Sequence, residues 1–488
     1  PPATLYNLSA ALVPALAAEL FFWLVYQLTA GSEQRRWPAI LGTALVLFTG
    51  NLSLWLFKPG LTGLSFMDFW NASRVVPGTI NEFPFWTSVF ADLHSHFLGM
   101  LFSAMFLAAL VLLQQRKAGA ATTALLAFAL ACLTLTNSWA APVYATLLLV
   151  GALMVSEAQR YRQVVAVLLA TVLLTLPFFN LPGNTLAMSY VVAPIGLAQG
   201  LYIFGPFLAV IAVWSMIGQP LRQLLMLLPC ALLVQGLAAG LLVLLAGKLG
   251  QQPRSSATEL AGAMALCALL VIVGSEWFTL VDRMNTVFKF HFEAWILLAL
   301  ASAVALAQII STRRFLAPVA MLVLLLGVPT SLQTLVAWWQ NPRIASSNAT
   351  FDGLAYLIHQ KPDEALAIAW LQQRVPGQPP ILEAYGPGYG SHARISAATG
   401  LPAWLGWAHH VSQHGHDREQ IDARIHQVEA AYTTLAGARE IARLGVRYGV
   451  RCGLEWATYG PETGKYWSAA GWQKVFSTPR CEIWSVTR

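Results

Sequence analysis

The chain has 488 residues, of which 57% are hydrophobic and only 10% are charged. A soluble domain carries about 25% charged residues, so this composition excludes an ordinary water-soluble protein. The net charge of +7 is explained by basic loops on one side of a membrane rather than by nucleic-acid binding, and the sequence contains no glycine-rich phosphate loop or nucleic-acid motif.

Apolar runs long enough to cross the hydrocarbon core of a bilayer recur along the first two-thirds of the chain. The candidate spans are residues 5–30, 38–57, 97–115, 121–137, 142–157, 164–179, 201–217, 223–247, 257–275, 291–311 and 316–339. We therefore predict a mainly α-helical, polytopic bundle of about 10–12 transmembrane helices. The chain begins PPATLYNL, without Met, and we expect it to be an N-terminally truncated part of a longer protein.

Basic residues gather in the short loops, which the positive-inside rule places in the cytoplasm. These loops are GSEQRRW (31–37), QQRKAG (114–119), EAQRYRQ (157–163), GQPLRQ (218–223) and STRRF (311–315). The rule then puts the long loop 58–96, the corner 136–142 and the segment 275–295 outside the cell membrane. A parity conflict remains between residues 218 and 256, because the single span there joins two flanks that are both basic.

The character of the chain changes after about residue 341, where charges and Gly-Pro turns become frequent. We predict a transmembrane domain over 1–341 and a soluble, extracytoplasmic α/β or α+β domain over 342–488. The periodicity predicts helices at 363–375, 417–435 and 437–445, and strands at 379–386, 446–456 and 481–486. Cys452 and Cys481 could form a disulfide if this domain is extracytoplasmic.

The loop before the third span contains ADLHSH (91–96), which sets Asp92, His94 and His96 one residue apart. In an extended segment the three side chains would point to one side, whereas in a helix only Asp92 and His96 would share a face. Either geometry could hold a divalent cation such as Mg, Mn or Zn, with Glu82 as a further carboxylate. The structural alternative is that Asp92 caps the next helix and the histidines are interfacial hydrogen-bonding groups.

Two further polar clusters fall on the same predicted side of the membrane. The first contains Glu276, Asp282, Arg283, Asn285, Lys289, His291 and Glu293, and the second is TNSWAAPVY, which includes Asn137 and Tyr144. Ionisable groups near membrane depth are costly and commonly functional, and Arg283 with Lys289 could hold a phosphate. The alternatives are an internal ion-pair network and an ordinary polar helix corner. Because all three polar clusters are predicted on the same side of the membrane, we favour one shared site.

The C-terminal domain gathers five of the ten histidines of the chain between residues 392 and 416, and Tyr385 and Tyr389 lie just before them. A metal site, a surface for a sugar or a lipid head group, and a solvated loop are all compatible with this pattern. The predicted strand at 379–386, which precedes these histidines, carries Glu383, a candidate substrate-binding residue.

Several long strings resemble the "YYY" family of uncharacterised prokaryotic multi-pass membrane proteins. They are SR-x-x-P, INEFP, DLH-x-H, TNSW, RMNT-x-FK and ILEAYG, and the resemblance runs from about residue 40 to the C-terminus. The family is distantly similar to the GT-C glycosyltransferases, integral membrane enzymes that use polyprenyl-phosphate sugars in extracytoplasmic loops. Two positions depart from its pattern: Ala140-Ala141-Pro142 stands where members carry D-x-P, and His409-His410 stands where they carry His-Glu.

The resemblance and the clusters together predict a GT-C-like glycosyltransferase that takes a polyprenyl-phosphate sugar from the membrane lipid. Asp92, or Glu82, is the expected general base or metal ligand, and Arg283 and Lys289 are expected to neutralise the leaving phosphate. The candidate substrate-binding residues are Arg74, His94, His96, Asn137, Arg283, Asn285, Lys289 and Glu383, and the candidate metal ligands are Asp92, His94 and His96. The alternatives are a transporter or flippase for an anionic lipid or sugar, and a non-catalytic membrane assembly protein.

Overall fold

A computed structural model describes residues 2–31, 34–54, 58, 65–115, 119–155, 158–178, 188–190, 195–217, 219, 241, 245, 256–339, 350–413 and 415–486. The chain divides into two compact units. A helical unit is formed within residues 8–180 and 186–349, and a C-terminal unit is formed within residues 350–486 together with residues 2–7. The domain boundary predicted at residues 341 and 342 lies outside the described residues.

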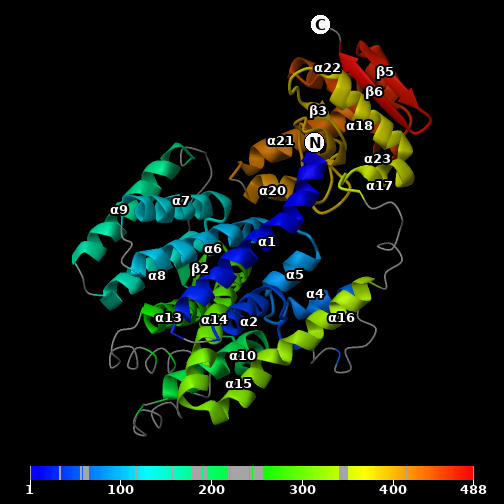
Figure 1. Ribbon diagram of the computed structural model, residues 1–488. Helices are drawn as coiled ribbons and strands as arrows, with labels where there is room; N and C mark the ends of the chain where they lie inside the picture. The colour runs from blue at the N-terminus through cyan, green and yellow to red at the C-terminus, as the bar shows by residue number, and fades with distance from the viewer. Residues whose placement is uncertain are drawn as a thin grey trace. The chain divides into compact units, whose positions relative to one another are not determined.

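The described part of the first two-thirds of the chain is almost entirely helical (Figure 1). Its elements are α1 (Pro2–Leu28), α2 (Arg36–Leu47), α4 (Phe66–Ala72), α5 (Pro84–Val89), α6 (Ser95–Gln114), α7 (Ala120–Thr136), α8 (Ala140–Val155), α9 (Ala158–Thr175), η1 (Leu176–Phe178), β1 (Met188–Tyr190), α10 (Leu197–Met216), α13 (Ser256–Trp277), β2 (Phe278–Leu280), α14 (Arg283–Thr312), η3 (Arg314–Leu316), α15 (Ala317–Leu324), η4 (Leu325–Gly327) and α16 (Val328–Trp339).

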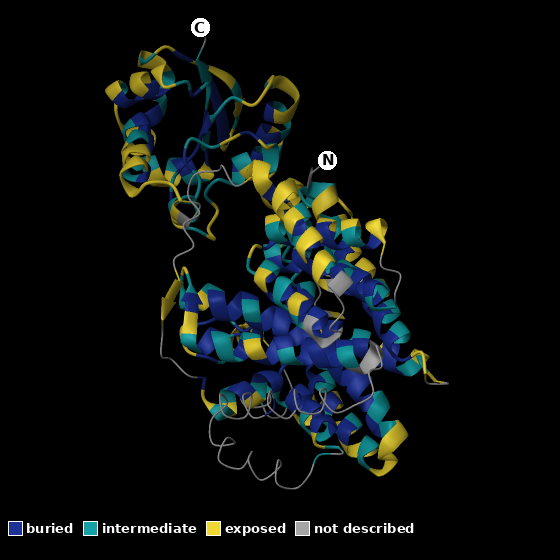
Figure 2. Ribbon diagram, turned by 90° about the vertical axis from the view of Figure 1, so that its left-hand side faces the viewer, coloured by how far each residue is buried: buried dark blue, intermediate teal, exposed yellow. Residues whose placement is uncertain are grey.

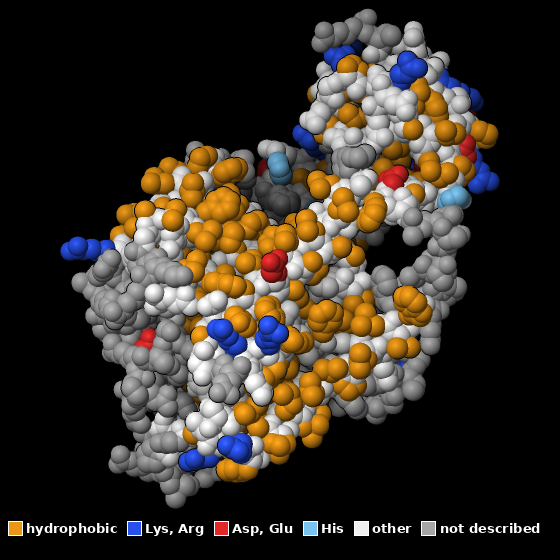
Figure 3. Space-filling model, viewed as in Figure 1, with side chains coloured by type: hydrophobic (Ala, Val, Ile, Leu, Met, Phe, Trp, Pro, Cys, Tyr) orange, Lys and Arg blue, Asp and Glu red, His pale blue; other side chains and the backbone are white. Residues whose placement is uncertain are grey.

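Seven helical segments among the described residues are long and apolar enough to cross a membrane. They are Ala3–Leu28, Ser95–Gln114, Tyr161–Phe178, Leu197–Met216, Glu259–Trp277, Arg283–Thr312 and Arg314–Ala337, and α2, α7 and α8 are shorter apolar helices. Large apolar side chains such as Leu173 on α9, Leu322 on α15 and Leu12 on α1 are exposed, and apolar side chains cover much of the face seen in Figure 3. Such faces fit a lipid environment. The prediction of a multi-pass helical membrane protein is confirmed.

Helix α14 lies at the centre of the helical unit. It runs for 30 residues without Gly or Pro, so nothing in its sequence breaks it. Its residues between Thr286 and Leu306 are almost all buried, because α2, α10 and α13 pack around it. The middle of the helical unit is largely buried in Figure 2. Gly42 lets α2 approach closely, since a Cβ there would lie 2.9 Å from Val25 and 3.2 Å from Ala303.

The start of α14 differs from the prediction. The hydropathy pattern places a span at 291–311 and treats 275–295 as a polar segment at its mouth, but the helix begins at Arg283. Asp282 is the reason: its side chain accepts a hydrogen bond from the Asn285 backbone N–H, which caps the helix. Lys289, His291 and Glu293 are therefore buried on a helix and do not lie in a loop.

The C-terminal unit combines helices with a four-stranded mixed sheet, in keeping with the predicted α/β or α+β domain. Its elements are α17 (Ala355–Gln360), α18 (Pro362–Arg374), β3 (Ile381–Leu382), α19 (Arg394–Thr399), α20 (Ala408–Gln413), α21 (Arg418–Thr433), α22 (Leu435–Arg443), β4 (Tyr448–Cys452), α23 (Gly453–Tyr459), α24 (Thr463–Ala469), β5 (Trp472–Thr478) and β6 (Cys481–Val486). The strand order is β3-β4-β6-β5, and the β3–β4 pair alone is parallel among these described strands.

Strand periodicity divides the core of this unit into two layers. Successive side chains of a strand point to opposite faces, so Ile381 and Ile483 join the apolar cluster that includes α18, whereas Leu382 and Trp484 join the cluster under α21 and α22. A disulfide links Cys452 of β4 to Cys481 of β6. The strand predicted over 446–456 is too long, because α23 begins at Gly453 and Glu455 accepts a hydrogen bond from the Cys452 backbone N–H.

Candidate functional site

The ADLHSH segment lies at the entrance to α6. Asp92 and His94 precede the helix and are about half exposed, at 46% and 48%, with Oδ2 of Asp92 3.2 Å from Nδ1 of His94. His94 is the N-cap residue of α6, which has no side-chain cap, so Asp92 does not cap this helix as the structural alternative required. His96 is the second residue of the helix and is fully buried. The three side chains therefore do not share one face.

His96 meets Lys289 of α14. Nζ of Lys289 lies 3.0 Å from Nδ1 of His96 and 3.5 Å from Oγ of Ser95. An ammonium group can only donate, so Nδ1 of His96 accepts and the imidazole carries its proton on Nε2. Nε2 lies 3.4 Å from Oγ1 of Thr87 and 3.7 Å from Oε2 of Glu82. The histidine thus joins a buried cation to a buried carboxylate.

Glu82 is also paired with Arg74, whose guanidinium lies 3.8 Å from Oε1 of the glutamate. We call Arg74, Glu82, His96 and Lys289 the Lys289 cluster. Burial raises the pKa of Glu82 to about 7, although the positive charge of Arg74 opposes this shift. Burial lowers the pKa of Arg74, which also stacks on the Trp70 ring at 3.4 Å. Two cations face one carboxylate that readily takes a proton, so the cluster carries a net positive charge.

The exposed and buried parts of this region are continuous. The ring centroids of His94 and His96 lie 5.2 Å apart, so the Asp92–His94 pair adjoins the Lys289 cluster. The His96 ring also packs edge-on against Phe288 and Phe292 of α14, at 4.5 and 4.7 Å. Aromatic walls of this kind fix the imidazole and exclude water on one side. The accessible carboxylate of Asp92 therefore lies next to the buried, positively charged Lys289 cluster.

A second buried carboxylate lies one turn further along α14. Oε2 of Glu293 accepts hydrogen bonds from the Tyr144 hydroxyl at 2.8 Å and from the Ser103 hydroxyl at 3.2 Å. Ser103 lies two turns after His96 on α6, and Asn137 packs against Gly99 between them, where a Cβ would lie 3.3 Å from the Cβ of Asn137. The three polar clusters predicted from the sequence therefore meet along α14: the loop 82–96 at Lys289, and Tyr144 at Glu293.

Arg283 and Asn285 are placed differently from each other. Nδ2 of Asn285 donates to Oδ2 of Asp282 at 2.8 Å, and Asn285 lies four residues before Lys289, hence on the same helix face. Arg283 lies six residues before Lys289, which turns the two side chains about 120° apart on a helix. The two cations that were predicted to hold one phosphate together do not share a face.

Glu383 lies in the C-terminal unit, at the end of β3, and is buried. Its two carboxylate oxygens accept hydrogen bonds from the backbone N–H groups of Ile395 and Ser396, at 3.1 and 2.9 Å. These are the first turn of α19, where backbone N–H groups lack helical partners. Burial raises the pKa of Glu383 to about 7, and the two amide hydrogen bonds oppose this. Its contacts are those of a residue that positions α19.

The predicted metal ligands do not converge in this geometry. Within the described ranges, no group of three or more His, Cys, Asp or Glu side chains is arranged to hold a metal ion. Nδ1 of His96 faces the Lys289 ammonium, which is incompatible with a cation bound at the same nitrogen, and Nδ1 of His94 faces Asp92. The residues present do not fit a divalent metal at Asp92, His94 and His96.

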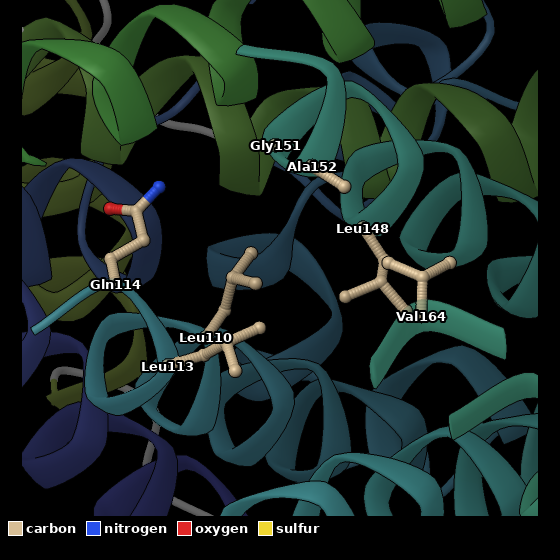
Figure 4. A pocket seen from close by; sticks show the side chains of 7 residues that line it. All are labelled: Leu110, Leu113, Gln114, Leu148, Gly151, Ala152 and Val164. Carbon is tan, nitrogen blue, oxygen red and sulfur yellow. The ribbon is translucent and has the colours of Figure 1, made fainter. Parts of the chain in front are cut away.

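A small cavity between α6, α8 and α9 is no alternative site. It is lined by Leu110, Leu113, Gln114, Leu148, Gly151, Ala152 and Val164 (Figure 4). Its volume is about 10 Å³, which is room for one water molecule at most. It is a packing defect between helices.

Sequence reasoning missed the residues that complete the site. The Thr87 hydroxyl lies within hydrogen-bonding distance of His96. The Ser95 hydroxyl accepts a hydrogen bond from Lys289, and the Ser103 hydroxyl donates one to Glu293. Ser95 and Ser103 were detectable in principle, because helical spacing from His96 puts Ser103 on the same face of α6. Thr87 was not, since its contact depends on how α5 packs against the start of α6.

A family model described as an uncharacterized membrane protein (DUF2298) matches residues 1–298, which is more than half of the chain and includes every residue of the Lys289 cluster. The chain belongs to this family. The membership predicted from the sequence strings, in a family of uncharacterised multi-pass membrane proteins, is confirmed.

Among solved structures, the chain is similar to the archaeal oligosaccharyltransferase AglB from Archaeoglobus fulgidus, which was solved in complex with an inhibitory peptide and a dolichol-phosphate. The identity is 13% and the TM-score is 0.38, over 99% of this chain. The chain spans 63% of the length of that transferase. No curated protein matches the chain.

Proposed function

We propose that this membrane protein is a glycosyltransferase that uses a polyprenyl-phosphate sugar as its donor. The observation that carries the proposal is the pairing of an accessible carboxylate, Asp92, with the buried and electropositive Lys289 cluster next to it. Transfer of a sugar from a lipid phosphate needs both a base for the acceptor hydroxyl and positive charge for the departing phosphate.

In this mechanism the acceptor hydroxyl attacks the anomeric carbon of the donor, and its proton passes to Asp92. The bond between the anomeric carbon and the phosphate oxygen breaks, and the electron pair stays on the lipid phosphate. His94 orients Asp92 through their 3.2 Å contact. Arg74, which is partly exposed, is the cation best placed to contact the phosphate, while Lys289 adds positive potential from within the low-dielectric wall.

The burial of Lys289 supports a functional role for it. Among the described residues no carboxylate forms a direct ion pair with Lys289, whose polar contacts are His96 and Ser95. A buried cation without a directly paired anion costs folding free energy, and ionisable groups at membrane depth commonly mark functional sites. A resident positive charge of this kind attracts a negatively charged head group.

We propose further that the protein resides in the cell membrane with its C-terminal unit on the extracytoplasmic side. The disulfide between Cys452 and Cys481 supports this side, because disulfides persist in oxidising compartments and are rare in the cytoplasm. The basic short loops place the loop 58–96 on the extracytoplasmic side by the positive-inside rule, so the donor would be used from the outer leaflet.

A transporter or flippase for an anionic lipid is the second candidate. The observation that favours it is the buried Glu293, hydrogen-bonded to Tyr144 and Ser103, which extends the polar contacts of α14 one turn deeper than Lys289. Such a protein needs the cations of the Lys289 cluster but no base at Asp92.

The Asp92→Asn variant separates the two. The purified protein, reconstituted in vesicles with a radiolabelled polyprenyl-phosphate sugar, should release polyprenyl phosphate and transfer the label to an added acceptor, and the variant should lose this activity. Asp422→Asn is the matched control, because Asp422 has the same 46% exposure and also pairs with a basic side chain. A variant Asp92→Asn with the full transfer rate would overturn the proposed base, and movement of the lipid between leaflets without transfer would favour the flippase.

A further inference from the structure

A second site candidate lies entirely within the C-terminal unit. A pocket of about 620 Å³ is formed by the segment that leads into α19 and by α20 with the residues after it. It is lined by Gly390, His392, Ala393, Arg394, Ser396, Ala397, Trp407, His410, Val411 and His416. This volume lies within the range of small-molecule sites.

Three rings, tilted against one another, form an aromatic platform at the edge of this pocket. Trp407 and His410 line the pocket, and Tyr389 packs beside them. The ring centroids of Tyr389 and Trp407 lie 5.6 Å apart, and the His410 ring lies 5.1 Å from each of them. The Trp407 indole is held in place because Nε1 donates to the His392 carbonyl at 3.0 Å. The platform is therefore built on a fixed indole.

Tyr389 is an exposed aromatic residue in an unfavourable backbone conformation. Its side chain is 79% exposed, and its backbone lies in the left-handed region at φ 62°. Such a conformation is disfavoured for a residue that carries a Cβ. Ala393, on the other side of His392, also lies in this region at φ 59°. Strain of this kind gathers at ligand-binding segments.

The charge of the lining is already neutralised. The Arg394 guanidinium makes two hydrogen bonds to Glu364 and two to Glu455, each of 3.0 Å. The hydrogen bonds and charges of these two carboxylates raise its pKa in spite of burial. Arg394 thus has little capacity left for a phosphate, and no carboxylate is among the lining residues for a cation.

The lining nevertheless offers polar groups to a ligand. Nδ1 of His392 is buried and has no hydrogen-bond partner among the described residues. The imidazole is held closely, since a Cβ at Gly386 would lie 2.2 Å from it. His410 and His416 add two further imidazoles to the lining.

We propose that this pocket is a binding site for a neutral saccharide. A sugar ring has an apolar C–H face that packs on aromatic rings and a rim of hydroxyl groups that both donate and accept hydrogen bonds. The Trp407–Tyr389 platform matches the first and the histidines match the second, while the occupied Arg394 disfavours an anion. The inference uses only the C-terminal unit and does not depend on Asp92 chemistry.

The test uses the full chain in lipid nanodiscs, prepared without glycoside detergents. Saturation-transfer NMR is recorded with methyl glycosides of glucose, mannose, galactose and N-acetylglucosamine, and with inorganic phosphate and Zn²⁺ in separate binding experiments. At least one glycoside should bind saturably. Tyr389→Ala should weaken it about tenfold, the loss expected when one aromatic face of about 1.4 kcal/mol is removed. Trp407→Phe, which keeps a ring, should weaken it less than Trp407→Ala.

Tyr356→Ala is the matched control, because Tyr356 is also exposed, at 52%, and lies in the same unit away from the residues that line the pocket. It should leave binding unchanged. Because Tyr389 is exposed, its replacement should not unfold the protein, so a loss of binding is interpretable even where Trp407→Ala fails to fold. The proposal is overturned if no glycoside binds, if binding survives Tyr389→Ala unchanged, or if phosphate or Zn²⁺ binds in place of the sugars.

Discussion

Nζ of Lys289 and Nδ1 of His96 lie 3.0 Å apart, although 193 positions separate the two residues. This contact joins α14 to the start of α6 and brings the DLHSH and RMNT-x-FK strings of the family into one cluster. It also places a positive charge in a buried position without a directly paired carboxylate among the described residues.

Replacing this charge should separate function from stability. Lys289→Met removes the desolvation cost of a buried ammonium, so the thermal unfolding midpoint should stay the same or rise, while sugar transfer should be lost. Lys465→Met, at an exposed lysine paired with Glu462, should change neither. A Lys289→Met protein that unfolds far earlier, while its folded fraction keeps the full transfer rate, would assign Lys289 a purely structural role.

Glu82 should make stability depend on pH. Its pKa is raised from 4.5 to about 7 in the folded protein, so between these values the folded state holds more protons than the unfolded state. Stability should therefore fall as pH rises through this window, by about 3 kcal/mol for a shift of about 2.5 units.

The measurement is the thermal midpoint of wild type and Glu82→Gln from pH 4.5 to 8. Glu383 has a similarly raised pKa and contributes to both proteins, so the informative quantity is the difference between them. As pH rises, the thermal midpoint of Glu82→Gln should increase relative to that of wild type. The midpoint of Glu462→Gln, a change at an exposed position, should vary with pH as that of wild type does. Parallel curves for wild type and Glu82→Gln would contradict the buried-carboxyl assignment.

The hydroxyl of Tyr144 should stabilise the helical unit through Glu293. Tyr144→Phe leaves the buried carboxyl with Ser103 as its remaining hydrogen-bond donor in the described residues, which should cost about 1–3 kcal/mol. In a Glu293→Leu background the same change should cost much less, because the acceptor is gone. Thermal unfolding of the four proteins in this cycle measures the coupling, and Tyr161→Phe, on the exposed side of α9, controls for loss of a hydroxyl. Equal costs in both backgrounds would exclude the interaction.

The disulfide should stabilise the C-terminal unit. It closes a loop with a sequence separation of 29, for which chain entropy predicts about 3–4 kcal/mol. The double variant Cys452→Ser, Cys481→Ser should therefore show earlier proteolysis of this unit, while Cys132→Ser, at a free cysteine, should not. In intact cells, a thiol-alkylating reagent should label Cys452 and Cys481 only after reduction; labelling without reductant would place the unit in a reducing compartment.

Hydropathy alone predicted the spans well, because a membrane leaves few alternatives to an apolar helix. It failed at the start of α14, where Arg283, Asn285 and Lys289 have the composition of a loop and only the Asp282 cap and the packing of neighbouring helices make them helical. It also missed β5, whose side chains are largely exposed. The span predicted at 223–247 falls mostly on residues outside those that the structure describes.

The site was predictable in its residue types but not in its pairings. The sequence placed Glu82, His96 and Lys289 on one side of the membrane, yet nothing local showed that His96 would turn inward while Asp92 and His94 stayed exposed. That difference follows from the start of α6 at Ser95. The contact of Tyr144 with Glu293 spans 149 positions, a separation that periodicity cannot bridge.

The Asp282 cap has a consequence for how the family can vary in length. Helix α14 starts at a fixed residue and turns about 100° per residue. The seven-residue separation of Lys289 from Asp282 therefore determines the direction in which the lysine side chain points. One residue inserted within this stretch would swing Lys289 away from His96. Only Val281 lies between β2 and Asp282, and the Thr286 hydroxyl hydrogen-bonds to both backbone groups of Leu280, so the constraint on chain length extends back to the end of β2.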